Sequence, residues 1–185
     1  AVESLLRANQ MTRSAPRGPV YVCLDDSLQE EPIPGKISIP DPARFAPAPS
    51  PAVPQASVRA ALKAIDQAKF PLILMGRVSR KQADWDRRVR FAETIGAAVL
   101  TSTNDPAAFP TTHPLHLAAP CLRPSKAATA LIEKADLIIS MDWLDLGGIL
   151  RLALGSAQTQ EPAGKTVIHC SMDNYRTNGW SMDHQ

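Results

Sequence analysis

The sequence lacks an excess of charge of either sign, because 20 lysines and arginines stand against 18 aspartates and glutamates. The net charge of +2 gives no strongly basic surface for nucleic acid or for an acidic membrane. No apolar run approaches the roughly 20 residues that a membrane helix needs. The start at Ala1 has neither the basic residues nor the apolar core of a signal peptide. We therefore expect a soluble cytoplasmic protein with no nucleic-acid partner and no membrane partner.

Cysteine is also scarce. The three cysteines, Cys23, Cys121 and Cys170, are odd in number and far apart in the chain. This pattern favours buried free thiols in a reducing compartment over a disulfide framework. Cys170 follows His169 directly, which would suggest an activated nucleophile. Successive side chains of a strand point to opposite faces, however, so we expect no catalytic cysteine there.

A metal site is the other chemistry that the histidines suggest. His113 and His116 stand near Cys121, but Pro114 separates the two histidines and disfavours their alignment on a helix. No fourth ligand of a zinc-type site is evident. The sequence therefore predicts no metal ligand and no catalytic residue in this chain.

Proline is abundant instead, and its distribution is uneven. Of the 17 prolines, eight lie between residues 30 and 54. Proline lacks a backbone donor and holds its predecessor in an extended conformation, so this stretch is expected to be an extended, semi-rigid interdomain linker. It could also be a loop that wraps over one domain, and both interpretations can hold together. The apolar residues that would anchor such a loop are Ile33, Ile37, Ile39 and Phe45.

The pattern before the linker predicts one helix and one strand. Residues 3–11, with the apolar Leu5 and Leu6, are expected to form a short helix, and residues 20–24 form a compact β-prone run. Asp25 and Asp26 then signal a turn. After the linker, helices and short apolar strands alternate. We expect helices that begin at Ser57, at Ser79 (with Gln82 as a capping box) and at Ser125, and a fourth over residues 144–154. The expected strands cover residues 71–75, 97–100, 137–141 and 165–170.

This alternation predicts an α/β fold, a Rossmann-like three-layer parallel sheet with helices on both faces, over residues 55–174. Residues 175–185 have no periodicity and are expected to start a second linker. On the outer face of the helix that begins at Ser79, the spacing of four residues between Asp84 and Arg88 predicts an exposed ion pair.

Ligands of such sheets bind beyond the carboxyl ends of the strands. Arg77 and the helix start at Ser79 could hold a phosphate there, Asp142 could accept a ribose hydroxyl, and Trp143 could stack on a base or flavin ring. Against this, the loop from Gly76 has one glycine, and an aspartate repels a phosphate. A solvated charged face and packing of Trp143 and Trp180 are the plainer alternatives. The candidate nucleotide-binding residues are Gly76, Arg77, Ser79, Asp142, Trp143 and Asp173.

Several short segments follow one another in an order that identifies a family. They are Arg17-Gly18-Pro19-Val20-Tyr21-Val22, Leu24-Asp25-Asp26-Ser27-Leu28-Gln29, and residues 68–76, 91–99, 109–114, 135–139 and 166–173. The first two resemble the last strand and the tail of the pyrimidine-binding domain of thiamine-diphosphate-dependent enzymes. The others resemble the central domain of that family. The branch of acetolactate synthase and benzoylformate decarboxylase is the most similar.

The resemblance implies a division of labour. Residues 1–29 would be the C-terminal piece of the pyrimidine-binding domain, residues 30–54 the linker, and residues 55–174 the central domain. The family's activating glutamate lies earlier in the first domain, and its Gly-Asp-Gly motif for metal and diphosphate does not occur in this sequence. The chain is thus expected to be a structural fragment of a carboligase or decarboxylase that acts on 2-keto acids or related substrates.

The resemblance also implies the cofactors and partners. Thiamine diphosphate and Mg²⁺ would belong to the parent enzyme, and the fragment itself would hold no cofactor and not be catalytic in isolation. FAD or ADP is a candidate ligand, since some members hold one in the central domain. The partners would be the other domains of the same enzyme, within a homodimer or homotetramer.

An alternative is a free-standing nucleotide-binding module for FAD, ADP or NAD, of the electron-transfer-flavoprotein or sirtuin-like type. Such a module has no need for a strand at 20–24 and a proline-rich linker ahead of its first helix. A sirtuin-like enzyme would also need a catalytic histidine and a zinc-binding cysteine set, which this sequence does not present convincingly.

Overall fold

The computed structural model describes residues 1–33, 35–155 and 164–173. The chain divides between Val53 and Pro54 into two compact units. The described residues include no helix that is both long and apolar enough to span a membrane. The expected second linker, residues 175–185 with Trp180, lies outside the described residues.

The first unit contains helix α1 (Val2–Arg13), the short helix α2 (Asp26–Glu30) and the 3-10 helix η1 (Pro42–Phe45). The Gln10 side-chain amide donates to the backbone oxygen of Ala46 at 2.8 Å. The proline-rich segment around η1 therefore contacts α1. The division of this unit into a domain piece over 1–29 and a linker over 30–54 stays a prediction.

The strand predicted over residues 20–24 was wrong, because the structure has no regular element there. A strand needs a partner for its backbone groups, and the described part of the first unit offers no neighbouring strand. Tyr21 is accordingly 90% exposed. The expected anchors Ile33, Ile37 and Ile39 are exposed as well, so they hold no surface of this unit.

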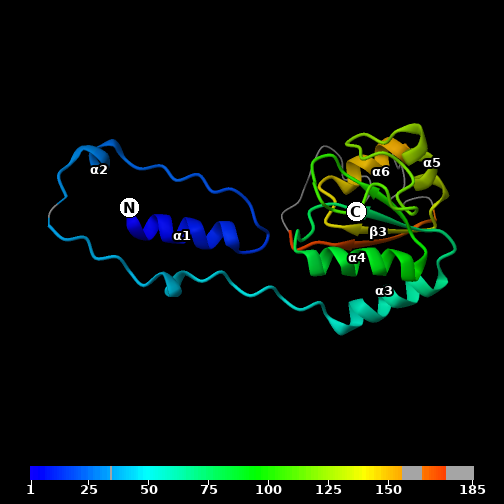
Figure 1. Ribbon diagram of the computed structural model, residues 1–185, viewed down its shortest axis with the longest axis horizontal. Helices are drawn as coiled ribbons and strands as arrows, with labels where there is room; N and C mark the ends of the chain where they lie inside the picture. Colours follow the sequence, from blue (N-terminus) through cyan, green and yellow to red (C-terminus); the bar gives the residue numbers. More distant parts are fainter. Residues whose placement is uncertain (34, 156–163, 174–185) are drawn as a thin grey trace. The chain divides into compact units, whose positions relative to one another are not determined.

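The second unit is a parallel sheet between two layers of helices, so the predicted α/β fold class is confirmed. The strand order is β2-β1-β3-β4. The strands are β1 (Pro71–Met75), β2 (Ala98–Thr101), β3 (Leu137–Met141) and β4 (Thr166–Cys170). Figure 1 shows α3 and α4 on one side of the sheet and α5 and α6 on the other. These helices are α3 (Gln55–Gln67), α4 (Gln82–Ile95), α5 (Lys126–Lys134) and α6 (Leu146–Leu154).

The central strand β1 explains why the sheet is covered on both faces. Its side chains alternate, so Leu72 and Leu74 pack against α5 and α6, whereas Ile73 and Met75 pack on the side of α4. All four side chains are fully buried. The chain leaves β1 toward β2 on one side and later returns to β3 on the other. The topological switch point of the sheet therefore lies between β1 and β3.

The helix starts agree only in part with the predicted caps. Ser125 caps α5 as predicted, since its hydroxyl accepts from the Ala128 N–H at 3.2 Å. Ser57, by contrast, lies inside α3, and Ser79 lies before α4. The Ser79 hydroxyl is bound to the Asp84 carboxylate at 2.7 Å. That contact leaves Ser79 outside the helix, and the predicted capping box was wrong.

The cysteines are free, as predicted, but they are not all buried. Cys121 is half-buried, and burial raises the pKa of its thiol. Cys23 and Cys170 are exposed. Cys170 ends β4, which lies at the edge of the described sheet and has no fully buried residue, so the expectation of burial was wrong for this strand.

Candidate functional site

The loops that follow β1 and β3 meet through their backbones at the switch point. The Gly76 N–H donates to the Met141 oxygen at 3.0 Å, and the Arg77 N–H donates to the Asp142 oxygen at 3.1 Å. A Cβ atom at Gly76 would lie only 2.5 Å from the Trp143 Cα. Glycine is therefore required at position 76 by the close approach of the second loop.

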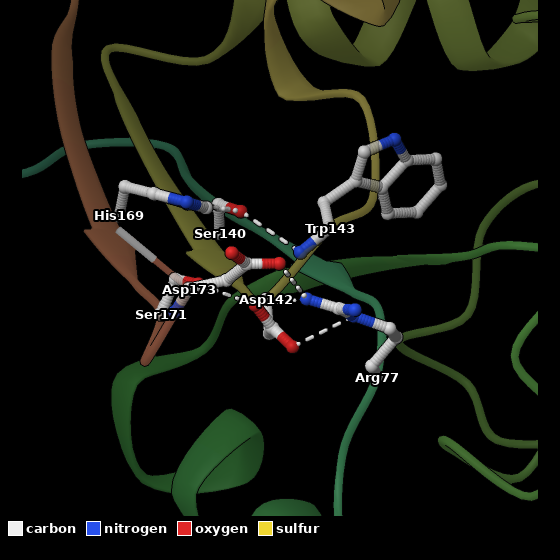
Figure 2. Close-up of polar contacts among 7 residues, drawn as sticks. All are labelled: Arg77, Ser140, Asp142, Trp143, His169, Ser171 and Asp173. Carbon is white, nitrogen blue, oxygen red and sulfur yellow. Dashed lines mark hydrogen bonds and ion pairs between the residues drawn. The ribbon is translucent and has the colours of Figure 1, made fainter. Parts of the chain in front are cut away.

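Four side chains form an ionic cluster at this edge of the sheet. The Arg77 Nε lies 3.0 Å from Asp142 Oδ2, and its Nη2 lies 3.1 Å from Asp173 Oδ2. The Ser171 hydroxyl donates to Asp142 Oδ1 at 2.6 Å. Figure 2 shows the guanidinium facing both carboxylates. We call Arg77, Asp142, Ser171 and Asp173 the edge cluster. It brings together three of the residues singled out in the sequence.

The edge cluster is partly withdrawn from solvent and holds two carboxylates around one guanidinium. The exposed side-chain fractions are 32% for Arg77, 22% for Asp142 and 17% for Asp173. Burial lowers the pKa of Arg77, but the hydrogen bonds and charges of the two aspartates outweigh it, so the pKa is raised overall. Both carboxylates lie against the one guanidinium of Arg77. A phosphate placed here would be repelled by the carboxylates.

Ser79 and Trp143 do not join the edge cluster. Ser79 is engaged with Asp84, as described above. Trp143 is 4% exposed and belongs to the core beneath α5 and α6. The backbone N–H of Trp143 donates to the hydroxyl of the fully buried Ser140 at 3.3 Å, and Nδ1 of His169 lies 3.0 Å from the same hydroxyl (Figure 2). This arrangement favours packing of Trp143 over stacking on a ligand ring.

Two positions near this edge were not found by sequence reasoning. Ser140 and Ser171 have no distinctive spacing, although Ser171 does follow an expected strand directly.

Arg88 was expected on the exposed face of its helix, but it is 8% exposed and donates to the Ala108 oxygen at 3.1 Å. Burial lowers the pKa of Arg88, and its hydrogen bonds hold the loop after β2. The spacing of four residues between Asp84 and Arg88 cannot distinguish an exposed arginine from a buried one.

The histidines have separate partners. Nε2 of His113 lies 3.2 Å from the Glu93 carboxylate, and Nε2 of His116 lies 2.9 Å from the Thr101 hydroxyl. Burial lowers the pKa of His116, which favours its neutral form. Within residues 1–33, 35–155 and 164–173, no three or more histidine, cysteine or acidic side chains are grouped so that they could hold a metal ion.

Residues 58–178 match a protein family described as the central domain of thiamine pyrophosphate enzymes. The chain belongs to this family. The resemblance stated from the sequence is thereby confirmed, and the alternative of an electron-transfer-flavoprotein or sirtuin-like module is not supported.

Relatives agree with this assignment. The acetolactate synthase large subunit of Corynebacterium glutamicum is 27% identical over 175 residues, which are 92% of this chain and 26% of that protein. The sulfoacetaldehyde acetyltransferase of Alcaligenes xylosoxydans xylosoxydans is 37% identical over 87 residues, which are 47% of this chain and 14% of that protein. The chain thus spans about a quarter or less of the length of these relatives.

The fold also has a counterpart among solved structures. An X-ray structure from Mycobacterium smegmatis, assigned to a thiamin diphosphate-dependent enzyme, superposes with a TM-score of 0.59 at 22% identity. The similarity covers 95% of this chain and 32% of that one. At this level of identity the likeness establishes the fold.

Proposed function

We propose that this chain supplies the central, structural part of an enzyme that uses thiamine diphosphate to join or cleave carbon–carbon bonds in 2-keto acids or related substrates. The family match over residues 58–178 is the observation that carries the proposal. The names of the two relatives, an acetolactate synthase and an acetyltransferase, share a two-carbon acetyl unit. We take an acetyl donor such as a 2-keto acid as the substrate class.

The chain's own residues have a positioning role in this proposal. The described residues do not fit Mg²⁺ with a diphosphate, because no group of three or more histidine, cysteine or acidic side chains is present among them and the guanidinium of Arg77 is already bound by Asp142 and Asp173. The 185 residues also contain no Gly-Asp-Gly motif. Thiamine diphosphate and Mg²⁺ are therefore assigned to other domains of the parent enzyme, where the cofactor supplies stabilisation of a carbanion.

The partners follow from this arrangement. The other domains of the same enzyme contact the central domain, and the parent is a homodimer or homotetramer in our proposal.

The three cysteines are unpaired, which fits a reducing compartment such as the cytoplasm.

Activity of the full-length product of the reading frame tests the proposal. Consumption of pyruvate and of a panel of other 2-keto acids is measured with and without thiamine diphosphate and Mg²⁺. We expect turnover that depends on the cofactor in the full-length protein and no turnover by the 185-residue chain under the same conditions. Turnover by the chain alone, or turnover of the full-length protein without the cofactor, would overturn the assignment.

A further inference from the structure

The switch point between β1 and β3 is the place where an open α/β sheet ordinarily binds a ligand. A phosphate bound there is held by free N–H groups of the loop after the first strand and of the following helix. In this chain the first three N–H groups of that loop already have acceptors. Those of Gly76 and Arg77 donate across to the β3 side, and that of Val78 donates to the Gly76 oxygen at 2.9 Å. The loop therefore offers no backbone donor from 76 to 78 to a phosphate.

The side chains of the edge cluster close the same place to an anion. Arg77 belongs to the loop after β1, and both Asp142 and Asp173 bind its guanidinium within 3.1 Å. Asp142 adopts a left-handed backbone conformation with φ of 55°, which turns the chain after β3. The backbone oxygen of Asp142 accepts from the backbone N–H of Arg77 at this turn. A diphosphate would have to displace two carboxylates and then lie beside them.

Packing leaves no room between the two loops either. Gly76 has space for a hydrogen atom and not for a Cβ, since the Asp142 and Trp143 backbones lie directly against it. Entry of a diphosphate would require the carboxyl ends of β1 and β3 to separate. The backbone hydrogen bonds from Gly76 and Arg77 to the β3 side, together with the ion pair between Arg77 and Asp142, oppose that separation.

From these contacts we infer that the edge cluster replaces a nucleotide in this domain. The Arg77 guanidinium joins the carboxyl ends of β1, β3 and β4 through Asp142, Ser171 and Asp173, and the closed edge excludes FAD and ADP. The candidate nucleotide site of the sequence is thus a ligand-independent structural contact. This inference does not rest on the proposed activity, because it concerns only the second unit of the chain.

Titration calorimetry of the 185-residue chain with ADP and with FAD tests the exclusion. We expect no binding of either nucleotide at concentrations up to about 1 mM. Saturable binding of ADP or FAD with a dissociation constant in the micromolar range would overturn the inference.

Thermal unfolding followed by circular dichroism tests the structural role of the edge cluster. Arg77→Gln is compared with Arg87→Gln, which breaks a surface ion pair with Asp84 in which the arginine side chain is 71% exposed. We expect the melting temperature to fall by roughly 4 °C or more in Arg77→Gln and by about 1 °C or less in the control. Equal melting temperatures of the two variants would contradict the role.

A milder variant keeps the test decisive if Arg77→Gln fails to fold. Asp173→Asn removes one carboxylate charge and leaves the Arg77–Asp142 pair in place. We expect a melting temperature between those of the wild type and Arg77→Gln, with a smaller response to salt than the wild type because one screened ion pair is missing. A wild-type melting temperature and salt response for Asp173→Asn would overturn the claim that Asp173 contributes.

Discussion

Substitution of Gly76 by alanine tests the close approach of the two loops. The added Cβ would lie 2.5 Å from the Trp143 Cα and 2.6 Å from the Asp142 carbonyl carbon, whereas ordinary contacts begin at 3.4 Å. The Asp142 carbonyl oxygen lies nearer still, so the loops must separate by at least about 0.9 Å, the difference between 3.4 and 2.5 Å. All three obstacles are backbone atoms, so no side-chain rotation relieves the clash.

The separation would break or stretch the contacts between the loops that follow β1 and β3. The hydrogen bonds from Gly76 and Arg77, now 3.0 and 3.1 Å long, would exceed the usual range. Each is worth about 1 kcal/mol, and partial loss of the ion pairs adds a comparable amount, so we expect a loss of roughly 2–4 kcal/mol. For a chain of this size that corresponds to a fall in melting temperature of about 6–12 °C.

Urea unfolding followed by tryptophan fluorescence measures this loss, with Trp143 buried beside the substituted residue. Gly18→Ala is the matched control, because nothing lies within 4 Å of its Cβ position and its φ is not positive. We expect the control to change stability by about 0.5 kcal/mol or less. If the unfolding midpoints of the two variants agree, the loops do not approach as closely as described.

Three further substitutions test other contacts, each by urea unfolding. Arg88→Met should destabilise by about 1–3 kcal/mol, because it leaves the buried Ala108 oxygen without its donor; no loss would show that the contact is dispensable. Asp136→Asn should cost about 1–2 kcal/mol at neutral pH, because the Asp136 carboxylate accepts from the Lys69 and Phe70 N–H groups, which lower its pKa from 3.8. A lowered pKa means that this contribution is present above the unfolded-state value and is lost as the pH falls through the folded-state value, so wild type and variant should converge in acid, below the unfolded-state value; a difference that stays constant throughout that acid range would refute the assignment. Ser125→Ala should cost about 1 kcal/mol through loss of the α5 cap, and wild-type stability would contradict that cap.

The sheet was predictable from sequence because its strands are short apolar runs that end at polar residues. Residues 71–75 and 137–141 were predicted with the bounds that β1 and β3 have in the structure. The proximity of Arg77, Asp142 and Asp173 could also be anticipated, since carboxyl ends of parallel strands meet at one edge of the sheet.

The remaining errors concern contacts that no local pattern encodes. Ser79 has the spacing of a capping box, yet its hydroxyl is bound to Asp84 five residues along the chain. The run at 20–24 has the composition of a strand, but a strand forms only where another strand pairs with it. The direction of the Trp143 ring and the burial of Arg88 depend on packing between elements far apart in sequence.

The most direct test of the central claim is titration of thiamine diphosphate with Mg²⁺ into two proteins, the 185-residue chain and the full-length product of its reading frame. If the chain is the structural central domain of a thiamine-diphosphate enzyme, the full-length protein binds the cofactor and the chain alone does not. Saturable binding by the chain alone, or no binding by the full-length protein, would contradict this account.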